Sequence, residues 1–490
     1  MGSHRITKMK HSEPLNSGYR SRRFHWQSLL LCVALVGCNT ESNVEKPESP
    51  ADTPSPIQVV VIEDEPLADA IRREWQAQSQ DPITVKSLSR LPTDSNTMRQ
   101  TDVVIFPTRY LGQFVEQKQI MPLPESVTDR QTTAASSYDW DDILPLNRRE
   151  EMRWAGTLYA VSFGSPRFLV IYRSDLLEQW NLTPPTTWTE YQETLQAIRT
   201  HISEESEVKF ATAEPLAEDW AARTFLARTA AYARHANQYS TLFDFTSMEP
   251  LINTAPYVRA LKELQEAYSE MTPYSLTMTP HQVAESVCKG ESVMGIAWPC
   301  PSDMTMPQNA AIGFARIPGS EQVYRNSEER WETKPEVRRH VPLLAVDGRL
   351  GAISRAAGNL EAAANLLLWL TSKDQSARIS THGYHTTLFR ESQRKNPAPW
   401  VPTELAAAAQ QYADVVNEEQ DSTQWLMMPR IPGQDRYLAI LDDAVRTAVL
   451  GNQQDPQQIL DQVAESWSQI TKDLGVDNQK KAYAQDLGID

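Results

Sequence analysis

Uncharged segments rich in β-branched residues alternate with amphipathic segments over the first part of this chain. Ile57–Ile62 (IQVVVI), Ile83–Leu88 and Asp102–Phe106 (DVVIF) have the composition of buried strands, whereas Leu67–Gln78 and Tyr110–Lys118 are typical of helices. This alternation predicts parallel or mixed sheets covered by helices. In such sheets ligands bind beyond the carboxyl ends of the strands, so a site is expected in the loops that follow them.

The pattern continues through the rest of the chain with one charged interruption. Further strands are predicted at Phe168–Tyr172, Ser292–Ala297 and Gly351–Ser354, and further helices at Pro280–Lys289, Asn359–Leu370, Thr403–Glu418, Tyr437–Leu450 and Pro456–Leu474. Thr187 and Glu190 have the spacing of a capping box at the start of another helix. Glu321–His340 is charged and has little apolar periodicity, which predicts a surface loop.

Length and charge narrow the classes of protein to which the chain can belong. Its 490 residues are too many for one hydrophobic core, so two domains are expected. Hydrophobic residues make up 40% and charged residues 22%, which is typical of soluble globular proteins. The net charge is −16 and no run of Lys and Arg forms a basic patch, which argues against nucleic acid as a partner.

The N-terminus has the features of a targeting segment. Arg20, Arg22 and Arg23 precede an apolar run, Ser28–Gly37, that is about half the length needed to span a bilayer. The run ends in Leu-Val-Gly-Cys at Cys38, which resembles the lipobox of bacterial lipoproteins and implies acylation of that cysteine. Residues 1–37 are therefore expected to be a signal peptide, and residues 38–56 the acylated cysteine and a flexible, polar tether. The alternative is an ordinary secretory signal in which the cysteine occurs by chance.

Two cysteines remain after the targeting segment. Cys288 ends a predicted helix and Cys300 follows the predicted strand Ser292–Ala297. A strand of that length separates its ends by roughly 20 Å, whereas the Cα atoms of a disulfide lie within about 7 Å. We therefore expect no disulfide between them.

Four stretches resemble family 1 of the extracellular solute-binding proteins, the group that includes maltose-binding proteins. They are Gly156–Tyr191 (with GTLYAVS, FLVIY and PTTW), Cys288–Pro299 (CKGESVMGIAWP), Gly348–Ser376 (with GAIS, NLLLWLTS) and Ala439–Gly451 (AILDDAVRTAVLG). Their joint order and spacing carries the resemblance, since each motif alone is weak. Ser162 stands where the family usually has Pro, and Thr386-Thr387 replaces its usual Pro-x-Arg turn.

The resemblance implies a periplasmic-binding-protein-like α/β fold of type II, with two lobes that crossing hinge segments join. One lobe would comprise residues 57–165 and 347–394, and the other residues 166–346 and 400–490. It also implies a monomer, lipid-anchored on the periplasmic side of the cell envelope, that captures a small solute between the lobes. The solute would be a sugar or oligosaccharide, and the partner the permease of an ABC importer.

Candidate ligand contacts lie mostly at predicted strand ends and in the loops that the resemblance indicates. A sugar needs flat aromatic faces and a few directed hydrogen-bonding groups, and each candidate has a structural role in the core or on the surface as its alternative. The candidates are Glu63, Asp64, Phe106, Thr108, Arg109, Tyr110, Phe163, Ser165, Arg167, Glu214, Trp298, Tyr384, His385, Trp425 and Arg430. Among them Trp298 is the expected stacking aromatic. Trp75, Trp188, Trp369 and Trp467 lie on predicted helices at apolar spacing and are expected in the core.

Motifs for catalysis and for cofactors are absent from the sequence. It contains no HExxH, GxSxG, P-loop, GxGxxG or CxxC motif, so we expect neither an enzyme nor a bound cofactor or metal. Two alternatives to a binding protein stay open: a secreted lipoprotein hydrolase that uses a carboxylate pair on carbohydrate, and a scaffold lipoprotein that has lost its ligand.

Overall fold

The computed structural model describes residues 55–79, 81–92, 95–129, 131–299, 306–333, 339–451 and 454–489. All of them belong to one compact unit, Pro54–Asp490. The predicted signal peptide, the lipidation site Cys38 and most of the predicted tether lie outside the described residues, and so does Cys300. Within these ranges no helix is long and apolar enough to cross a membrane.

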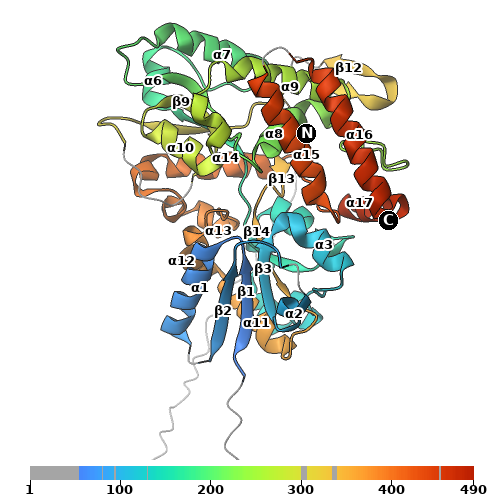
Figure 1. The fold of residues 1–490 in the computed structure, drawn as a ribbon. Coiled ribbons are helices and arrows are strands. Elements are labelled where there is room, and N and C mark those ends of the chain that lie inside the picture. Colours follow the sequence, from blue (N-terminus) through green and yellow to red (C-terminus); the bar gives the residue numbers. More distant parts are fainter. Residues whose placement is uncertain are drawn as a thin grey trace, which may run out of the picture. The chain divides into compact units, whose positions relative to one another are not determined.

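A five-stranded mixed sheet contains the first strands of the chain, in the order β2-β1-β3-β14-β6. Its members are β1 (Ile57–Ile62), β2 (Ile83–Leu88), β3 (Val103–Pro107), β6 (Ala160–Gly164) and β14 (Arg349–Ile353). Strand β1 is parallel to β2 and β3, whereas β14 is antiparallel to β3 and β6. The helices around this sheet, in the lower half of Figure 1, are α1 (Glu65–Gln78), α2 (Ser95–Arg99), α3 (Leu111–Glu116), α4 (Glu125–Thr128), α5 (Thr133–Tyr138), α11 (Leu360–Leu370), α12 (Lys373–Ile379) and α13 (Glu391–Arg394).

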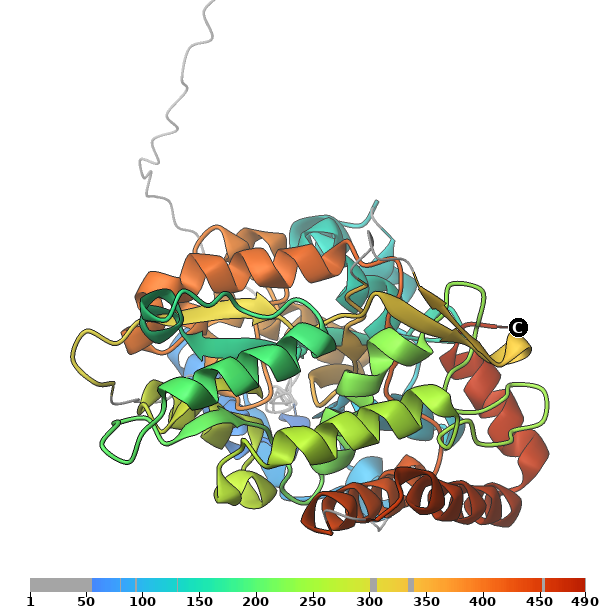
Figure 2. The same cartoon turned by 90° about the horizontal axis from the view of Figure 1, so that it is seen from above.

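A second mixed sheet of four strands, in the order β10-β7-β9-β8, forms a separate layer. Its members are β7 (Leu169–Arg173), β8 (Phe210–Ala213), β9 (Ser292–Ala297) and β10 (Ile312–Arg316). Its helices are α6 (Ser174–Gln179), α7 (Trp188–His201), α8 (Ala221–Ala233), α9 (Ala255–Tyr268), α10 (Pro280–Cys288), α14 (Ala409–Gln420), α15 (Gln434–Leu450), α16 (Pro456–Leu474) and α17 (Val476–Asp486). Figure 2 shows α14, in orange, running alongside β10. The predicted α/β class, with two mixed sheets and their own helices, is confirmed.

Buried polar contacts fasten the segments that connect the two sheets. Residues 165–168 lead from β6 to β7, and the segment before β14 contains β13 (Leu343–Leu344), which pairs with β15 (Leu426–Met427). The buried carboxylate of Glu151 accepts hydrogen bonds from the Ser165 hydroxyl at 2.8 Å, the Ala345 N–H at 2.7 Å and Arg167 Nη1 at 3.0 Å. One carboxylate thus ties two connecting segments together.

Several sequence predictions differ from the structure. The predicted surface loop contains a hairpin of β11 (Gln322–Arg325) and β12 (Arg330–Thr333), in which Tyr324 pairs with Trp331. The loop prediction was wrong because these two aromatic rings, 5.3 Å apart, give the hairpin an apolar face among charged residues. A further short pair is formed by β4 (Arg153–Trp154) and β5 (Thr157–Leu158).

The helix predicted at Tyr110–Lys118 is a 3-10 turn, Thr108–Tyr110, followed by α3, and the helix predicted at Thr403–Glu418 begins with a 3-10 segment up to Ala408. Trp188 and Trp467 are buried, as predicted, whereas Trp75 and Trp369 are half-buried and line a cavity of about 560 Å³. Cys288 is buried and free.

Candidate functional site

Charged side chains meet where strands of the first sheet end. The guanidinium of Arg109, which follows β3, forms ion pairs with Glu63, which follows β1, and with Asp347, which precedes β14. The Tyr110 hydroxyl donates to Glu63 Oε1 at 3.2 Å, and Arg349 Nη2 donates to the Glu63 carbonyl at 2.7 Å. Because β14 is antiparallel to β3, the residue before β14 lies beside the residues after β3. We call Glu63, Arg109, Asp347 and Arg349 the ion network.

Burial and neighbouring charges shift the pKa values of Arg109 and Asp347 in opposite directions. Burial alone would lower the pKa of Arg109, but the carboxylates of Asp347 and Glu63 raise it above its ordinary value. Burial would raise the pKa of Asp347, but Arg109, His385 and Arg349 hold it well below its ordinary value. Both groups are therefore charged at neutral pH.

Asp64, the neighbour of Glu63, has a structural role. It is the N-cap of α1, where its Oδ1 accepts the Leu67 N–H at 3.2 Å, and its Oδ2 lies 3.5 Å from Arg349 Nε. Glu63 itself has φ of 58°, a left-handed conformation that residues with a side chain seldom adopt. The turn between strand and helix thus presents one carboxylate to the ion network and uses the next to begin the helix.

An aromatic cavity of about 440 Å³ lies beside the ion network. We call it the aromatic cavity. It is lined by Trp220, Thr279, Pro280, His281, Gln282, Trp298, Tyr384 and His385. Trp298 follows β9 of the second sheet, Trp220 precedes α8, and Thr279 to Gln282 begin α10. Tyr384 and His385 follow α12, which belongs to the first sheet. The walls therefore come from the helices and strands of both sheets.

Tryptophan rings form one wall of the aromatic cavity. The ring of Trp298 lies 5.5 Å from Trp220 and 5.4 Å from Phe168, and its Nε1 donates to the Tyr384 carbonyl at 3.5 Å. Only 2% of Trp298 and 7% of Trp220 is exposed, whereas 47% of Tyr384 is exposed. The two indoles thus form a packed wall, and Tyr384 supplies an accessible ring to the same cavity.

Two histidines also line the aromatic cavity, His385 and His281. His385 Nδ1 lies 2.9 Å from an Asp347 carboxylate oxygen, and its ring is nearly parallel to Trp220, with centroids 6.2 Å apart. His281 lies 6.0 Å from the Tyr384 ring, and burial lowers its pKa, so it is neutral at pH 7. No carboxylate is among the described residues that line the aromatic cavity. Its chemistry is that of flat apolar faces with a few hydrogen-bonding groups, of which His385 is paired with Asp347.

The predicted contacts fall into groups. Trp298, Tyr384 and His385 line the aromatic cavity, Glu63 and Arg109 belong to the adjoining ion network, and Tyr110 donates to Glu63. Phe106, Thr108 and Phe163 are fully buried in the first sheet and its 3-10 turn. Ser165 and Arg167 bind Glu151 in a connecting segment.

Glu214 lies in a separate buried cluster. Its side chain has no exposed surface and forms an ion pair with Arg228, whose Nε donates to it at 2.8 Å, while the Tyr191 hydroxyl donates at 3.0 Å. Arg228 also lies over the Trp188 ring at 4.3 Å. These contacts satisfy the Glu214 carboxylate within the protein and leave it outside the lining of the aromatic cavity.

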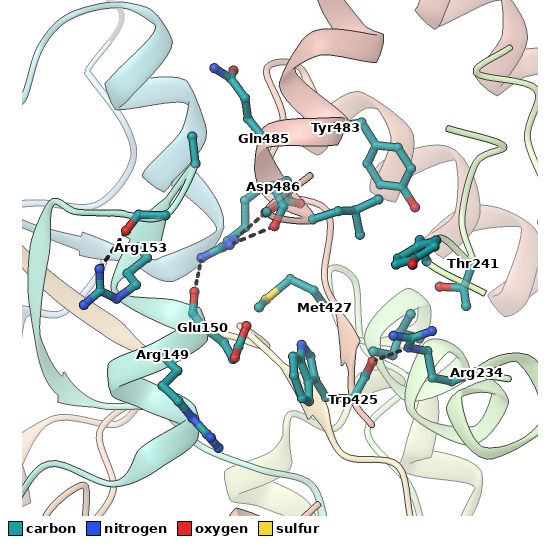
Figure 3. Close-up of a pocket in the computed structure, with 17 residues that line it drawn as sticks. Arg149, Glu150, Arg153, Arg234, Thr241, Trp425, Met427, Tyr483, Gln485 and Asp486 are labelled. Atoms are coloured by element: carbon teal, nitrogen blue, oxygen red, sulfur yellow. Dashed lines mark hydrogen bonds and ion pairs between the residues drawn. The ribbon is translucent and has the colours of Figure 1, made fainter. Parts of the chain in front are cut away.

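Trp425 and Arg430 line a third cavity, of about 170 Å³ (Figure 3). Arg430 Nε donates to Asp486 Oδ1 at 2.7 Å and its Nη1 to the Glu151 carbonyl at 3.0 Å. The structure therefore brings these two predicted contacts together, but in a cavity with a different lining.

Trp220, His281, Gln282 and Asp347 were missed by the sequence predictions. Asp347 precedes a strand rather than following one, so a search of carboxyl ends overlooks it. Thr279-Pro280 is an N-cap followed by Pro, a recognisable helix start whose position beside Trp298 only the fold reveals. Among the described residues no group of three His, Cys, Asp or Glu could hold a metal ion.

Comparisons with known proteins match this chain to a protein family. The model of the bacterial extracellular solute-binding protein family matches residues 74–407. No curated protein matches the sequence.

Solved structures share the fold at low sequence identity. An ABC transporter solute-binding protein from Agrobacterium radiobacter in complex with ribitol is 18% identical, with a TM-score of 0.61, and the match covers 84% of this chain and 98% of that one. Maltose-bound MalE3 of T. maritima is 17% identical, with a TM-score of 0.58 and coverage of 84% and 100%. A solute-binding protein from Agrobacterium vitis with bound D-mannitol is 17% identical, with a TM-score of 0.58 and coverage of 86% and 99%. The periplasmic-binding-protein-like fold with two lobes is thereby confirmed.

Proposed function

This chain belongs to the bacterial extracellular solute-binding protein family, and we propose that it captures a small, uncharged, polyhydroxylated solute in the aromatic cavity and delivers it to the permease of an ABC importer. The observation that carries the proposal is the origin of the cavity walls. Trp220, Trp298 and His281 come from the second sheet and its helices, whereas Tyr384 and His385 come from the first. A ligand that touches both walls binds the closed arrangement better than an open one, and this difference in affinity drives closure.

The chemistry of the lining supports an uncharged ligand. Indole and phenol faces pack against C–H surfaces, and Thr279, His281 and Gln282 offer neutral donors and acceptors. Among the charged groups near the lining, Asp347, which contacts His385, is paired with Arg109, whereas the guanidinium of Arg223 lies over the Trp220 ring at 4.8 Å. The ribitol, maltose and D-mannitol in the related structures are uncharged and polyhydroxylated, in agreement with this ligand class.

Thermal unfolding with ribitol, D-mannitol and maltose tests the ligand class. A solute at 100 times its dissociation constant should stabilise the chain by about 2.7 kcal/mol. Ammonium acetate and glutamate at the same concentrations serve as charged controls and should give no comparable shift. Stabilisation by glutamate alone would contradict an uncharged ligand.

We also propose that Cys38 is acylated and tethers the protein to the periplasmic side of the envelope, with residues 38–56 as the tether. The Cys38→Ser variant should be released into the soluble fraction. Continued membrane association of that variant would contradict the anchor.

We further propose that one lobe comprises residues 57–165 with 347–394 and the other residues 166–346 with 400–490, and that the protein acts as a monomer without catalysis. Incubation with maltose should release no glucose above the buffer rate.

A further inference from the structure

Arg223 is a buried cation without a carboxylate partner. Only 5% of it is exposed, and it forms no ion pair with a residue that the structure describes. Its one hydrogen bond within the described part of the chain runs from Nε to the Val346 carbonyl at 3.1 Å. Burial lowers the pKa of Arg223 below its ordinary value, although the charge of Asp347 opposes this shift. Because a buried charge without a partner costs stability, folding alone does not account for this residue.

The guanidinium of Arg223 lies against a wall of the aromatic cavity. Its central carbon is 4.8 Å from the centroid of the Trp220 ring. Trp220 is the N-cap of α8 and Arg223 lies three residues later, a spacing at which side chains on a helix are neighbours. A cation over an indole face is attracted to it, most strongly where water is excluded, and only 7% of Trp220 is exposed. The contact therefore restrains the Trp220 ring.

The two neighbours of the Trp220 ring are both tied to the same short stretch of chain. Arg223 donates to the carbonyl of Val346. His385, whose ring is nearly parallel to Trp220, lies 2.9 Å from a carboxylate oxygen of the next residue, Asp347. Val346 and Asp347 lie between β13 and β14, in a segment that connects the two sheets. The contacts thus form a closed cycle that joins the start of α8 to this connecting segment.

We propose that Arg223 is a positioning residue, which holds the Trp220 indole in the wall of the aromatic cavity for stacking on the solute and links it to the segment between β13 and β14. This inference rests on the proposed function, since it requires a solute that stacks on Trp220. An aromatic ring that is already held in place loses less conformational entropy when the solute binds, which raises the affinity. A gain in affinity also explains why the fold keeps a buried cation that costs stability.

Calorimetric titration and thermal unfolding of Arg223→Met test the proposal. With the most stabilising of ribitol, D-mannitol and maltose, the affinity should fall about tenfold, the scale of one cation–π contact that is shielded from water. The melting temperature without solute should be unchanged or higher, because the unpaired buried charge is gone. Arg223→Lys keeps a cation beside the indole and should restore most of the affinity.

Arg259→Met is the matched control. The guanidinium of Arg259 lies over the Tyr232 ring at 4.3 Å, but it is paired with Glu263, and neither Arg259 nor Tyr232 lines the aromatic cavity. This variant should lower the melting temperature and leave the solute affinity unchanged. Full solute affinity in Arg223→Met would overturn the positioning role.

A double-mutant cycle shows whether Arg223 acts through the indole. In the Trp220→Ala background, Arg223→Met should weaken solute binding no further, because the ring that it positions is absent. Additive losses of affinity in the double variant would overturn the proposal, since Arg223 would then act independently of Trp220.

Near-ultraviolet circular dichroism of the solute-free chain tests the same contact without a ligand. The difference between the unaltered chain and Trp220→Ala gives the signal of the ordered indole. Arg223→Met should lose that signal, whereas Arg223→Lys should keep it. Absence of binding by all three solutes would contradict the proposed function, and an unchanged spectrum of Arg223→Met would overturn the positioning role of Arg223.

Discussion

Buried carboxylates in this protein have environments that differ sharply, and the environment decides what each can do. The half-buried Glu63 and the buried Asp347 share Arg109 at the edge of the aromatic cavity, Glu214 is enclosed with Arg228, and Glu419 is buried and forms no ion pair with a residue that the structure describes. The sequence gives these residues the same chemistry. Their different roles come from partners that lie far away in the chain.

The Glu214–Arg228 pair should contribute to stability rather than to ligand binding. Glu214→Gln leaves the buried guanidinium of Arg228 without its counter-ion, which should lower the free energy of unfolding by about 3–5 kcal/mol. Urea unfolding measures the loss, and the exposed Glu218→Gln serves as the matched control. A variant with unchanged stability but weakened solute affinity would show instead that Glu214 contacts the ligand.

Glu419 should make stability depend on pH. Burial raises its pKa from the ordinary 4.5 to about 8, so the folded chain holds this proton more tightly than the unfolded chain does. The free energy of unfolding should therefore fall as pH rises from about 4.5 to 8, by about 1.4 kcal/mol per pH unit from this group, and the contribution should level off above pH 8. Glu419→Gln should remove that slope and stabilise the chain at pH 8, whereas Glu465→Gln on the surface of α16 should keep it. Parallel pH profiles for Glu419→Gln and the unaltered chain would contradict the assignment.

At the scale of elements, periodicity and caps were enough to predict most strands and helices, and strand ends indicated part of the site. The strand at Ile57–Ile62 and the helix at Pro456–Leu474 have the predicted bounds. The capping box predicted at Thr187 is only partly formed, since Glu190 accepts from the Thr186 N–H instead of the N-cap N–H. Asp347 could not be predicted, because it meets Arg109 only through an antiparallel pairing across 238 residues. The ion pair of Glu214 with Arg228 could not be predicted either, because it depends on how β8 and α8 pack in the fold.

The start of α10 combines a helix cap with a wall of the aromatic cavity. Thr279 accepts the Gln282 N–H, and the Gln282 side chain accepts the Thr279 N–H at 2.9 Å, a complete capping box. Thr279→Ala should cost about 1 kcal/mol of stability and loosen Gln282 at the cavity. Thermal unfolding measures the first effect. The loosening of Gln282 should appear as a weaker solute affinity in Thr279→Ala, which Thr279→Ser should restore. Equal solute affinities in the two variants would show that the helix cap does not contribute to solute binding.

At the scale of the whole molecule, the ligand site is expected where walls from the two sheets face each other. Glu151 ties two connecting segments, Trp220 and Trp298 build one wall from the second sheet, and Tyr384 and His385 contribute from the segment after α12 of the first. Neither wall alone encloses a solute. Capture therefore depends on contributions from both.

Calorimetric titration of Trp220→Ala and Tyr384→Ala with the most stabilising of ribitol, D-mannitol and maltose tests this claim most directly. Each variant removes one aromatic face from a different wall and should weaken binding by about 1.5–3 kcal/mol, or roughly 10- to 150-fold. The exposed aromatic variant Phe245→Ala should bind like the unaltered chain. Full affinity in both Trp220→Ala and Tyr384→Ala, with the fold retained, would contradict capture in the aromatic cavity.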